Sequence, residues 1–526
     1  MPRTEYVCLL SCLLQQTSVS GADTRREEKR KAMGRRQPPR FLAAVALGLS
    51  VLLIVAAVQA QSSEERDQRF LPNGMLFPNS EGTSSTISTT GRIDLTNPFF
   101  ERLGTNGRTC ASCHLPGEGM SISADSVQLR FDLTQGSDPI FRTNDGANCD
   151  TSDVSTVAAR RNAYSLLRTR GLIRVTVGVP SSANFTVTDV SNQYGCNDTN
   201  TISMYRRPLP SANLRFLSAV MWDGRESAGA NKITYANYST QLIKNLLTQS
   251  LDATNGHAQG TGVRPTDAEK AQIVNFEMAL YSAQATGRGT GRLDARGARG
   301  GPEALVAQPF FISINSSIHP FFPMLETPGS DPFDPAIFNI FDAWAGLPSS
   351  DARAAVARGQ TLFNTTPINI AGVAGINDDP AAGGLGLTGG FTGTCGTCHD
   401  SPNVGNHSFA TPLNIGTGDP MPGNPNVNLG GLDIRYLPKM TACKDPNDAT
   451  TCKTTTDLGQ ALVDGNFDHI GKIKGPVLRS LASRAPYFHN GSAKTLLDVV
   501  KFYEGRFGVV YTPQQESDLV AFLSSL

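Results

Sequence analysis

The hydrophobic and polar positions along this chain form short helical patterns that are separated by long stretches typical of loops. Apolar side chains recur every three to four positions over residues 268–285, and this strongest amphipathic pattern predicts a helix. A helix is also predicted at 97–113, where Asn97 and Pro98 suit a helix start. Further helices are predicted within 214–259 and at 351–363 (capped by Ser349 or Ser350), 495–503 and 514–526.

Other segments lack this period. Residues 125–210 are rich in Gly, Asn, Asp and Thr, and they contain alternating stretches around 172–179 and 184–190 that predict a pair of strands. We interpret 125–210 as an insertion or cap. Residues 62–90 are polar and predict an extended lead-in, and the Gly/Arg-rich stretch 287–302 predicts a mobile loop.

The N-terminal region predicts export. An apolar run at 41–58 follows Arg35, Arg36 and Arg40 and precedes the small residue Ala60, a pattern typical of a secretory signal cleaved after Ala60. The run is slightly long, so an uncleaved membrane anchor is the alternative. We expect residues 1–60 to be an N-terminal extension with a signal peptide, and a disulfide-permissive location outside the cytoplasm.

Composition narrows the class of protein. The 526 residues carry 46 basic and 46 acidic side chains, which argues against a general nucleic-acid binder. Residues 1–60 hold nine basic and four acidic residues, so 37 basic and 42 acidic residues remain after cleavage. The length suggests two or three domains, and 51 Gly and 32 Pro imply long ordered loops.

The sequence Cys-x-x-Cys-His occurs twice, at 110–114 and at 395–399. This spacing lets two thiols reach the two vinyl groups of one haem and places the adjacent His to ligate the iron. A redox pair does not need the His, and a zinc site needs four ligands, whereas the motifs are far apart in the chain. We therefore predict two covalently bound haem c groups, held by Cys110, Cys113, His114, Cys395, Cys398 and His399.

The two motifs divide the chain after the signal. We predict a mainly α-helical fold of two cytochrome c-like haem lobes joined by long loops, with a small β-containing insertion in the first lobe. The first haem c domain covers 61–345, with its insertion at about 125–210, and the second covers 346–526. Four further cysteines allow three pairings, of which we expect the local ones, Cys149–Cys196 and Cys443–Cys452.

Three more segments stand out: Met221-Trp222-Asp223-Gly224-Arg225, residues 246–259, and the run 475–507 that contains Pro-Tyr-Phe-His-Asn-Gly-Ser. With one haem motif in each half, they resemble the bacterial di-haem cytochrome c peroxidase family and its MauG-like branch. The resemblance implies that the haem of His114 reacts with peroxide and that the six-coordinate haem of His399 supplies electrons. It makes Trp222, next to Arg225 in this motif, a candidate relay, although a large aromatic there also suits a plain core.

The resemblance also implies ligands. Where family peroxidases place a Met ligand to the second haem, this chain has Tyr503, as in the MauG-like branch. A phenolate favours ferric or higher iron, and a buried aromatic is the alternative role. The family binds a calcium ion between its lobes. Carbonyls of Arg484 and Pro486 are candidate ligands here, while Arg207 replaces the expected Asn ahead of Trp222.

The pocket of the first haem departs from the family, which places a Gln and then a Glu about ten residues later. Gln249 matches the Gln, but the later position is Gln259, and only Asp252 and His257 between them are ionisable. His257 has suitable chemistry for acid–base work, and a surface or capping role is the alternative.

The expected protein is thus a periplasmic di-haem c-type oxidoreductase. It reduces hydrogen peroxide at the first haem with electrons from a small cytochrome c or cupredoxin, binds no nucleic acid, and contacts a membrane only if the signal is uncleaved. The alternatives are a MauG-like oxidant of a partner protein, a di-haem oxygenase of the rubber-cleaving type, and a non-catalytic electron-transfer cytochrome.

Overall fold

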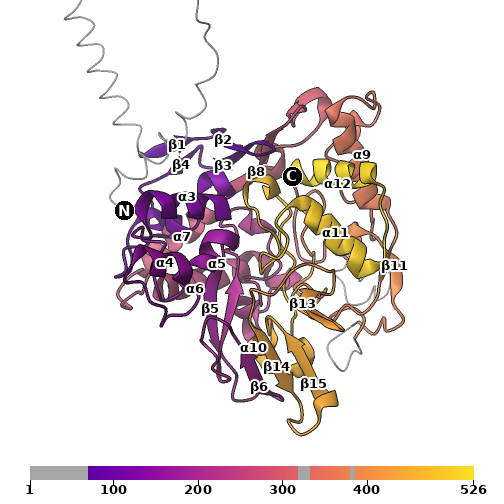
Figure 1. Cartoon of the computed structure of the whole chain (residues 1–526). Coiled ribbons are helices and arrows are strands. Elements are labelled where there is room, and N and C mark those ends of the chain that lie inside the picture. The colour runs from indigo at the N-terminus through magenta and orange to yellow at the C-terminus, as the bar shows by residue number, and fades with distance from the viewer. Residues whose placement is uncertain (1–68, 318–331, 379–384) are drawn as a thin grey trace, which may run out of the picture. The chain divides into compact units, whose positions relative to one another are not determined.

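The computed structural model describes residues 69–317, 332–378 and 385–526 (Figure 1). The predicted signal and extension at 1–60 lie outside these residues. The chain divides into two compact units, residues 1–71 with 93–96 and residues 72–92 with 97–526. The described part of the first unit holds most of β1 (Phe70–Pro72) and β4 (Arg92–Asp94), which pair with each other. Among the described residues, no helix is long and apolar enough to cross a membrane.

The second unit combines helices with small antiparallel sheets. Its α-helices are α3 (Ala124–Thr134), α4 (Val157–Ala163), α5 (Ser165–Arg170), α6 (Tyr238–His257), α7 (Asp267–Met278), α8 (Pro302–Val306), α9 (Ala352–Thr365), α10 (Ala461–Asp464), α11 (Leu496–Phe507) and α12 (Pro513–Ser524). Its strands are β2 (Leu76–Asn79), β3 (Gly82–Ser88), β5 (Ile173–Gly178), β6 (Thr186–Ser191), β7 (Thr201–Arg206), β8 (Leu280–Gly287), β9 (Gly291–Arg292), β10 (Ile368–Ile370), β11 (Phe391–Gly393), β12 (Pro420–Met421), β13 (Asn424–Asn428), β14 (Lys439–Cys443) and β15 (Cys452–Thr455).

The prediction of one helix over 268–285 is wrong in its second half. The helix α7 ends at Met278, and β8 follows directly as an inner strand of the sheet β2-β3-β8-β9. The first five residues of β8 are all buried, and its backbone pairs with β3. Residues 69–90 of the predicted lead-in at 62–90 therefore do more than lead in, since β3 forms part of this sheet, and residues 62–68 lie outside the described residues. Tertiary pairing overrides the local helical period here.

Both strands predicted within 125–210 form, but they do not pair with each other. The strand β5 pairs with β7, whereas β6 pairs with β14 of the C-terminal half, which in turn pairs with β15 (Figure 1). Val187 and Val190 of β6 are buried in one cluster with Met440 of β14. A strand is fixed to the partner that buries its apolar face, and a local alternating pattern does not name that partner.

The predicted helix at 97–113 is also wrong. One 3-10 turn, Pro98–Phe100, forms after Asn97, whose side chain accepts a hydrogen bond from Phe99 N. The chain leaves the helical path at Glu101, which is extended, and Gly104 lies in the irregular stretch that follows. A Cβ atom there would lie 2.0 Å from the carbonyl oxygen of Ala258, just beyond α6. This close approach requires glycine and an irregular backbone.

The C-terminal helices agree with the prediction. Helix α9 begins after Asp351, which caps it in place of the expected serines, and α11 begins after Thr495. Helices α9 and α12 are in close contact, because Gly359 lets the backbone of Asp518 approach. Phe363 and Phe522 pack in the core between these helices.

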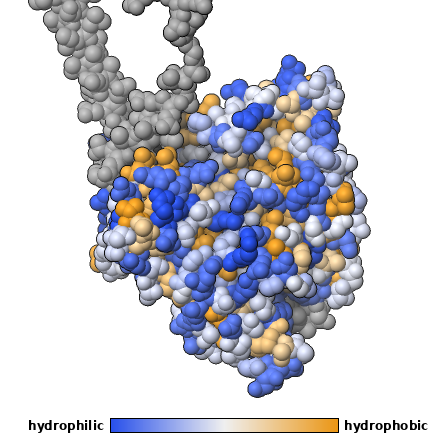
Figure 2. All heavy atoms as spheres, viewed as in Figure 1, coloured by the Kyte–Doolittle hydropathy of each residue, from blue (hydrophilic) through white to orange (hydrophobic). Residues whose placement is uncertain are grey.

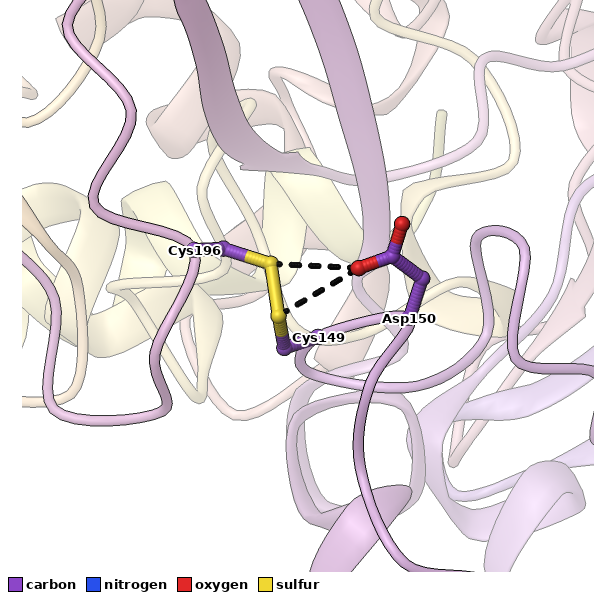
Figure 3. Close-up of side chains that lie close together, drawn as sticks. All are labelled: Cys149, Asp150 and Cys196. Carbon is purple, nitrogen blue, oxygen red and sulfur yellow. Dashed lines mark hydrogen bonds between the residues drawn. A yellow bond between two sulfur atoms is a disulfide. The ribbon is translucent and has the colours of Figure 1, made fainter.

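Both local disulfides are present, as predicted. Cys443–Cys452 links β14 to β15, and Cys149–Cys196 staples two loops of the 125–210 segment. Figure 3 shows Asp150 beside the Cys149–Cys196 disulfide, with a carboxylate oxygen 3.4 Å from the sulfur of Cys149. Because the two sulfurs are bonded to each other, neither is free to bind a metal as a thiolate.

Candidate haem-binding sites

The two Cys-x-x-Cys-His motifs have the same local structure. Each opens with a threonine and a 3-10 turn, Cys110–Ser112 after Thr109 and Cys395–Thr397 after Thr394. In each, the backbone N–H of the histidine donates to the carbonyl of the first cysteine, at 3.1 Å for His114 and 3.0 Å for His399. This turn brings both cysteines and the histidine to the wall of one cavity.

Each motif lines its own cavity. The first cavity has a volume of about 450 Å³ and is walled by Cys110, Cys113 and His114, and the second, of about 190 Å³, by Cys395, Cys398 and His399. The four cysteines of the motifs are the free ones among the described residues. The face shown in Figure 2 carries hydrophobic residues scattered among polar ones.

The rings of His114 and His399 are both neutral and bound to a carbonyl through Nδ1. The Nδ1 of His114 lies 2.9 Å from the carbonyl oxygen of Met120, and that of His399 lies 3.2 Å from the carbonyl of Gly405. Burial lowers the pKa of each ring to about 4. A neutral ring whose Nδ1–H donates to a carbonyl keeps Nε2 free for a metal, which is the usual arrangement of a haem ligand.

The surroundings of the two histidines differ. The hydroxyl of Ser211 lies 3.1 Å from Nδ1 of His114, and the buried carboxyl of Glu277 lines the same cavity. Burial raises the pKa of Glu277 to about 7, and hydrogen bonding from Ser211 opposes this shift. For His399 the structure records only the Gly405 carbonyl as a hydrogen-bond partner of Nδ1 among the described residues.

One face of α6 forms part of the first cavity. Its lining positions are 246, 249, 250, 252, 253, 254, 256 and 257, so both Gln249 and His257 reach the cavity wall. Nδ1 of His257 lies 2.6 Å from Oδ2 of Asp145, and the other oxygen of Asp145 pairs with Arg108. Burial acts to raise the pKa of Asp145, but Arg108 and the His257 hydrogen bond together hold it below its usual range.

Two carboxylates that were not expected together also line this cavity. Glu226 follows the Trp-Asp-Gly-Arg motif, and Asp252 lies on α6. Burial, followed by the charge of Asp252, raises the pKa of Glu226 to about 7. Gln259 is absent from the described lining residues, so the position of the family Glu does not reach the cavity here.

Trp222 lines both cavities. Its indole Nε1–H donates to the carbonyl of Arg207 at 2.7 Å, and its ring meets His489 edge to face at 6.1 Å between centroids. Arg225 lines the first cavity and donates to Asp223 at 3.0 Å. Because a relay must approach both redox centres, the position of Trp222 is compatible with the predicted role.

Tyr503 lines the second cavity from α11, stacked on Phe507 at 6.0 Å between ring centroids. Burial and the neighbouring sulfurs of Cys395 and Cys398 raise its pKa above the usual range. The structure thus brings Tyr503 to the motif of His399, where the resemblance places a ligand.

The charges around the cavities fit a group with carboxylates. Lys474 lines both cavities and Arg479 lines the first, and both side chains are buried. Neither forms an ion pair with a described residue, and Nε and Nη1 of Arg479 have no hydrogen-bond partner. Burial lowers the pKa of Lys474 to about 7. Uncompensated buried cations are costly, and the propionates of a haem would compensate them.

Sequence reasoning missed Asp145, Ser211, Glu226, Glu277 and Lys474. A signal existed for Glu277, since it shares the apolar face of α7 with Ile273 and Val274. No local signal marked Asp145 or Ser211, which lie in loops.

No family model matches the chain. The chain is 36% identical over 81 residues to the cytochrome-c peroxidase IdrP1 of Denitromonas iodatirespirans, covering 13% of this chain and 22% of that protein. It is 31% identical over 145 residues to the cytochrome-c peroxidase IdrP2 of the same organism, covering 26% of this chain and 37% of that protein.

The matches thus span well under two thirds of either relative's length. A solved MauG-like protein associated with microbial copper homeostasis shares 16% sequence identity with a TM-score of 0.34, over 82% of this chain and 86% of that chain. The two sequence matches support, loosely, a relationship between this chain and peroxidase-like oxidoreductases.

Proposed function

We propose that the protein is an exported di-haem c-type oxidoreductase that reduces hydrogen peroxide at the motif of His114, with one haem in each of two cytochrome c-like lobes, 61–345 and 346–526. The observation that carries the proposal is the His257–Asp145 pair, which lies on the wall of the same cavity as His114. The partial similarity to cytochrome-c peroxidases supports the reaction class. When bound, the haem would supply the iron that binds peroxide and accepts electrons.

The chain's own residues manage protons. Asp145 is ionised at neutral pH and accepts the Nδ1–H of His257, so Nε2 is left as the basic nitrogen. His257 would take a proton from one peroxide oxygen and return it to the other, and the Gln249 amide would orient the peroxide. With two electrons and two protons, hydrogen peroxide yields two water molecules.

Electrons would enter at the second site. Trp222 lines both cavities and keeps its indole N–H bound to a carbonyl, which is a weak base. The indole therefore keeps its proton while an electron passes. A small periplasmic cytochrome c or cupredoxin remains the expected donor.

The environment of His114 supports assigning the peroxide reaction to the first site. Ser211, backed by Glu277, polarises the Nδ1–H of His114 and makes the ring a stronger donor. We expect Ser211→Ala to raise the reduction potential of the first haem and to slow its reaction with peroxide by about 10-fold or more.

Spectroelectrochemical titration of the holoprotein measures this effect. The second haem is the internal control, because His399 has no such hydroxyl neighbour among the described residues. Equal shifts at both haems, or none at the first, would contradict the role of Ser211.

A second candidate function is oxidation of a partner protein or oxygenation of an organic substrate. The observation that favours it is the contribution of residues 173–176, from the 125–210 segment, to the first cavity. A wall from this segment gives the cavity a shape that peroxide alone does not need.

The test is a visible and near-infrared titration of the ferric holoprotein with stoichiometric peroxide. We expect loss of a high-spin signal, and an oxidised spectrum that a reduced cytochrome discharges over many turnovers. A long-lived oxidised state that small donors barely discharge would favour the second candidate. An unchanged spectrum in both the ferric and the half-reduced protein would reject peroxide chemistry and leave an electron carrier or an oxygenase.

A further inference from the structure

Arg207 is a buried cation held by backbone carbonyls. Only 5% of the surface of Arg207 is exposed to solvent, yet this residue forms no ion pair with a described residue. Its Nη1 donates to the carbonyls of Arg170 and Gly171 at 3.1 and 3.0 Å. Its Nη2 donates to the carbonyl of Ile122 and, at 3.0 Å, to that of Arg484. Four carbonyl oxygens thus converge on one positive charge.

These carbonyls come from segments far apart in the chain. Ile122 precedes α3, Gly171 ends α5, and Arg484 belongs to the C-terminal half. The backbone of Arg207 adds two further links: its N–H donates to the carbonyl of His489 at 2.6 Å, and its own carbonyl accepts from Trp222. Arg207 therefore connects the N-terminal and C-terminal halves of the unit by hydrogen bonds. It does so next to Trp222, which lines both cavities.

The backbone is shaped around this guanidinium. Gly171 has a φ of +59°, and a Cβ atom at that position would lie 1.7 Å from Nη1 of Arg207. Burial lowers the pKa of Arg207 to about 10. The negative charge of Glu118 opposes this shift and favours the charged guanidinium. Arg207 is still charged at neutral pH.

A cage of carbonyl oxygens with a nearby carboxyl is the kind of site that otherwise binds calcium. The family resemblance implies calcium between the lobes, with the carbonyls of Arg484 and Pro486 as candidate ligands. The Arg484 carbonyl accepts a hydrogen bond from Arg207 instead. The residues present do not fit a calcium ion, because the guanidinium already uses the oxygens and repels a second cation.

We propose that the guanidinium of Arg207 takes the place of the calcium ion, so that this chain joins its two halves with a built-in cation and requires no calcium. The inference is independent of peroxide reduction, since it concerns only how Trp222 and the two cavities are held in position.

The first experiment uses the wild-type holoprotein after dialysis against EGTA. We expect isothermal titration with calcium chloride to show no stoichiometric binding, and the unfolding temperature and haem spectra to be the same with EGTA and with calcium. Uptake of one calcium ion per chain, with a rise in unfolding temperature, would overturn the proposal.

The second experiment uses Arg207→Asn, which opens the cage and restores the residue type that the family resemblance implies. We expect a lower unfolding temperature in EGTA, uptake of one calcium ion per chain, and recovery of stability with calcium but not with magnesium, which demands a stricter geometry. A variant that folds but binds no calcium would contradict the cation-site assignment.

Arg506→Asn is the matched control. Arg506 also donates to three backbone carbonyls, those of Ala371, Gly372 and Ile415, all within the C-terminal half. We expect calcium to leave the unfolding temperature of Arg506→Asn unchanged. If calcium raised the unfolding temperatures of Arg207→Asn and Arg506→Asn equally, the effect would be nonspecific and the proposal would be rejected. If Arg207→Asn fails to fold, the wild-type titration still decides.

Discussion

Replacing Cys110 and Cys113 together with alanine is expected to remove one of two covalent haems and to abolish the reaction with peroxide. Without its thioether links the haem leaves, and the cavity of about 450 Å³ loses the group that would fill it, so the unfolding temperature should also fall. The mass of the denatured protein and the pyridine haemochrome spectrum measure the haem content, with two haems per chain falling to one.

Two variants serve as controls for this result. Cys395→Ala with Cys398→Ala should also remove one haem but leave a first site that reacts with peroxide and no longer turns over with a reduced cytochrome. Cys149→Ala with Cys196→Ala removes two cysteines joined in a disulfide and should keep both haems. Full haem content after loss of either motif would refute the assignment of that motif.

Replacing His257 with alanine is expected to slow the reaction of the ferric protein with peroxide by about 10²–10⁴-fold, the usual contribution of a general acid–base group. Haem content and the reduction potentials of both haems should be unchanged, because His257 lies on α6 rather than in a haem motif. Stopped-flow measurement of the second-order rate constant checks this expectation.

Neighbouring variants distinguish His257 from the carboxylates of the same cavity. Asp145→Asn should cause a smaller loss, because the ring keeps its place but no longer has a carboxylate on Nδ1. Glu226→Gln should change the rate by less than about 10-fold. A large loss in Glu226→Gln with a near-normal rate in His257→Ala would assign the proton transfer to Glu226 instead.

Features encoded in a few neighbouring residues were predictable. Each Cys-x-x-Cys-His motif occupies five consecutive positions, and the starts of α9 and α11 were predicted to within one residue, although Asp351 caps α9 in place of the expected serines. The local disulfide pairings also follow from short separations along the chain, 47 and 9 residues. The motif and capping residues are adjacent in sequence, and each disulfide joins cysteines within one half of the chain, so little depends on contacts between the halves.

Features that depend on distant partners were not predictable. The alternation around 184–190 indicates a strand, but any edge that buries Val187 and Val190 satisfies it, and β14 is some 250 residues away. The period at 268–285 continues past Met278, yet the buried place beside β3 makes the second part a strand. Backbone pairing and burial outweighed local preference at these positions.

By itself, then, the sequence supplied the two Cys-x-x-Cys-His motifs and the helices α9, α11 and α12, while haem attachment and the export signal stay predictions. Only the tertiary structure decided the partners of the reactive groups: Asp145 lies 112 residues from His257, and Ser211 lies 97 residues from His114. It also placed Trp222 on both cavities and filled a carbonyl cage with Arg207. A hydrogen bond needs atoms within about 3 Å, and between distant residues only the packing of the whole chain brings them that close.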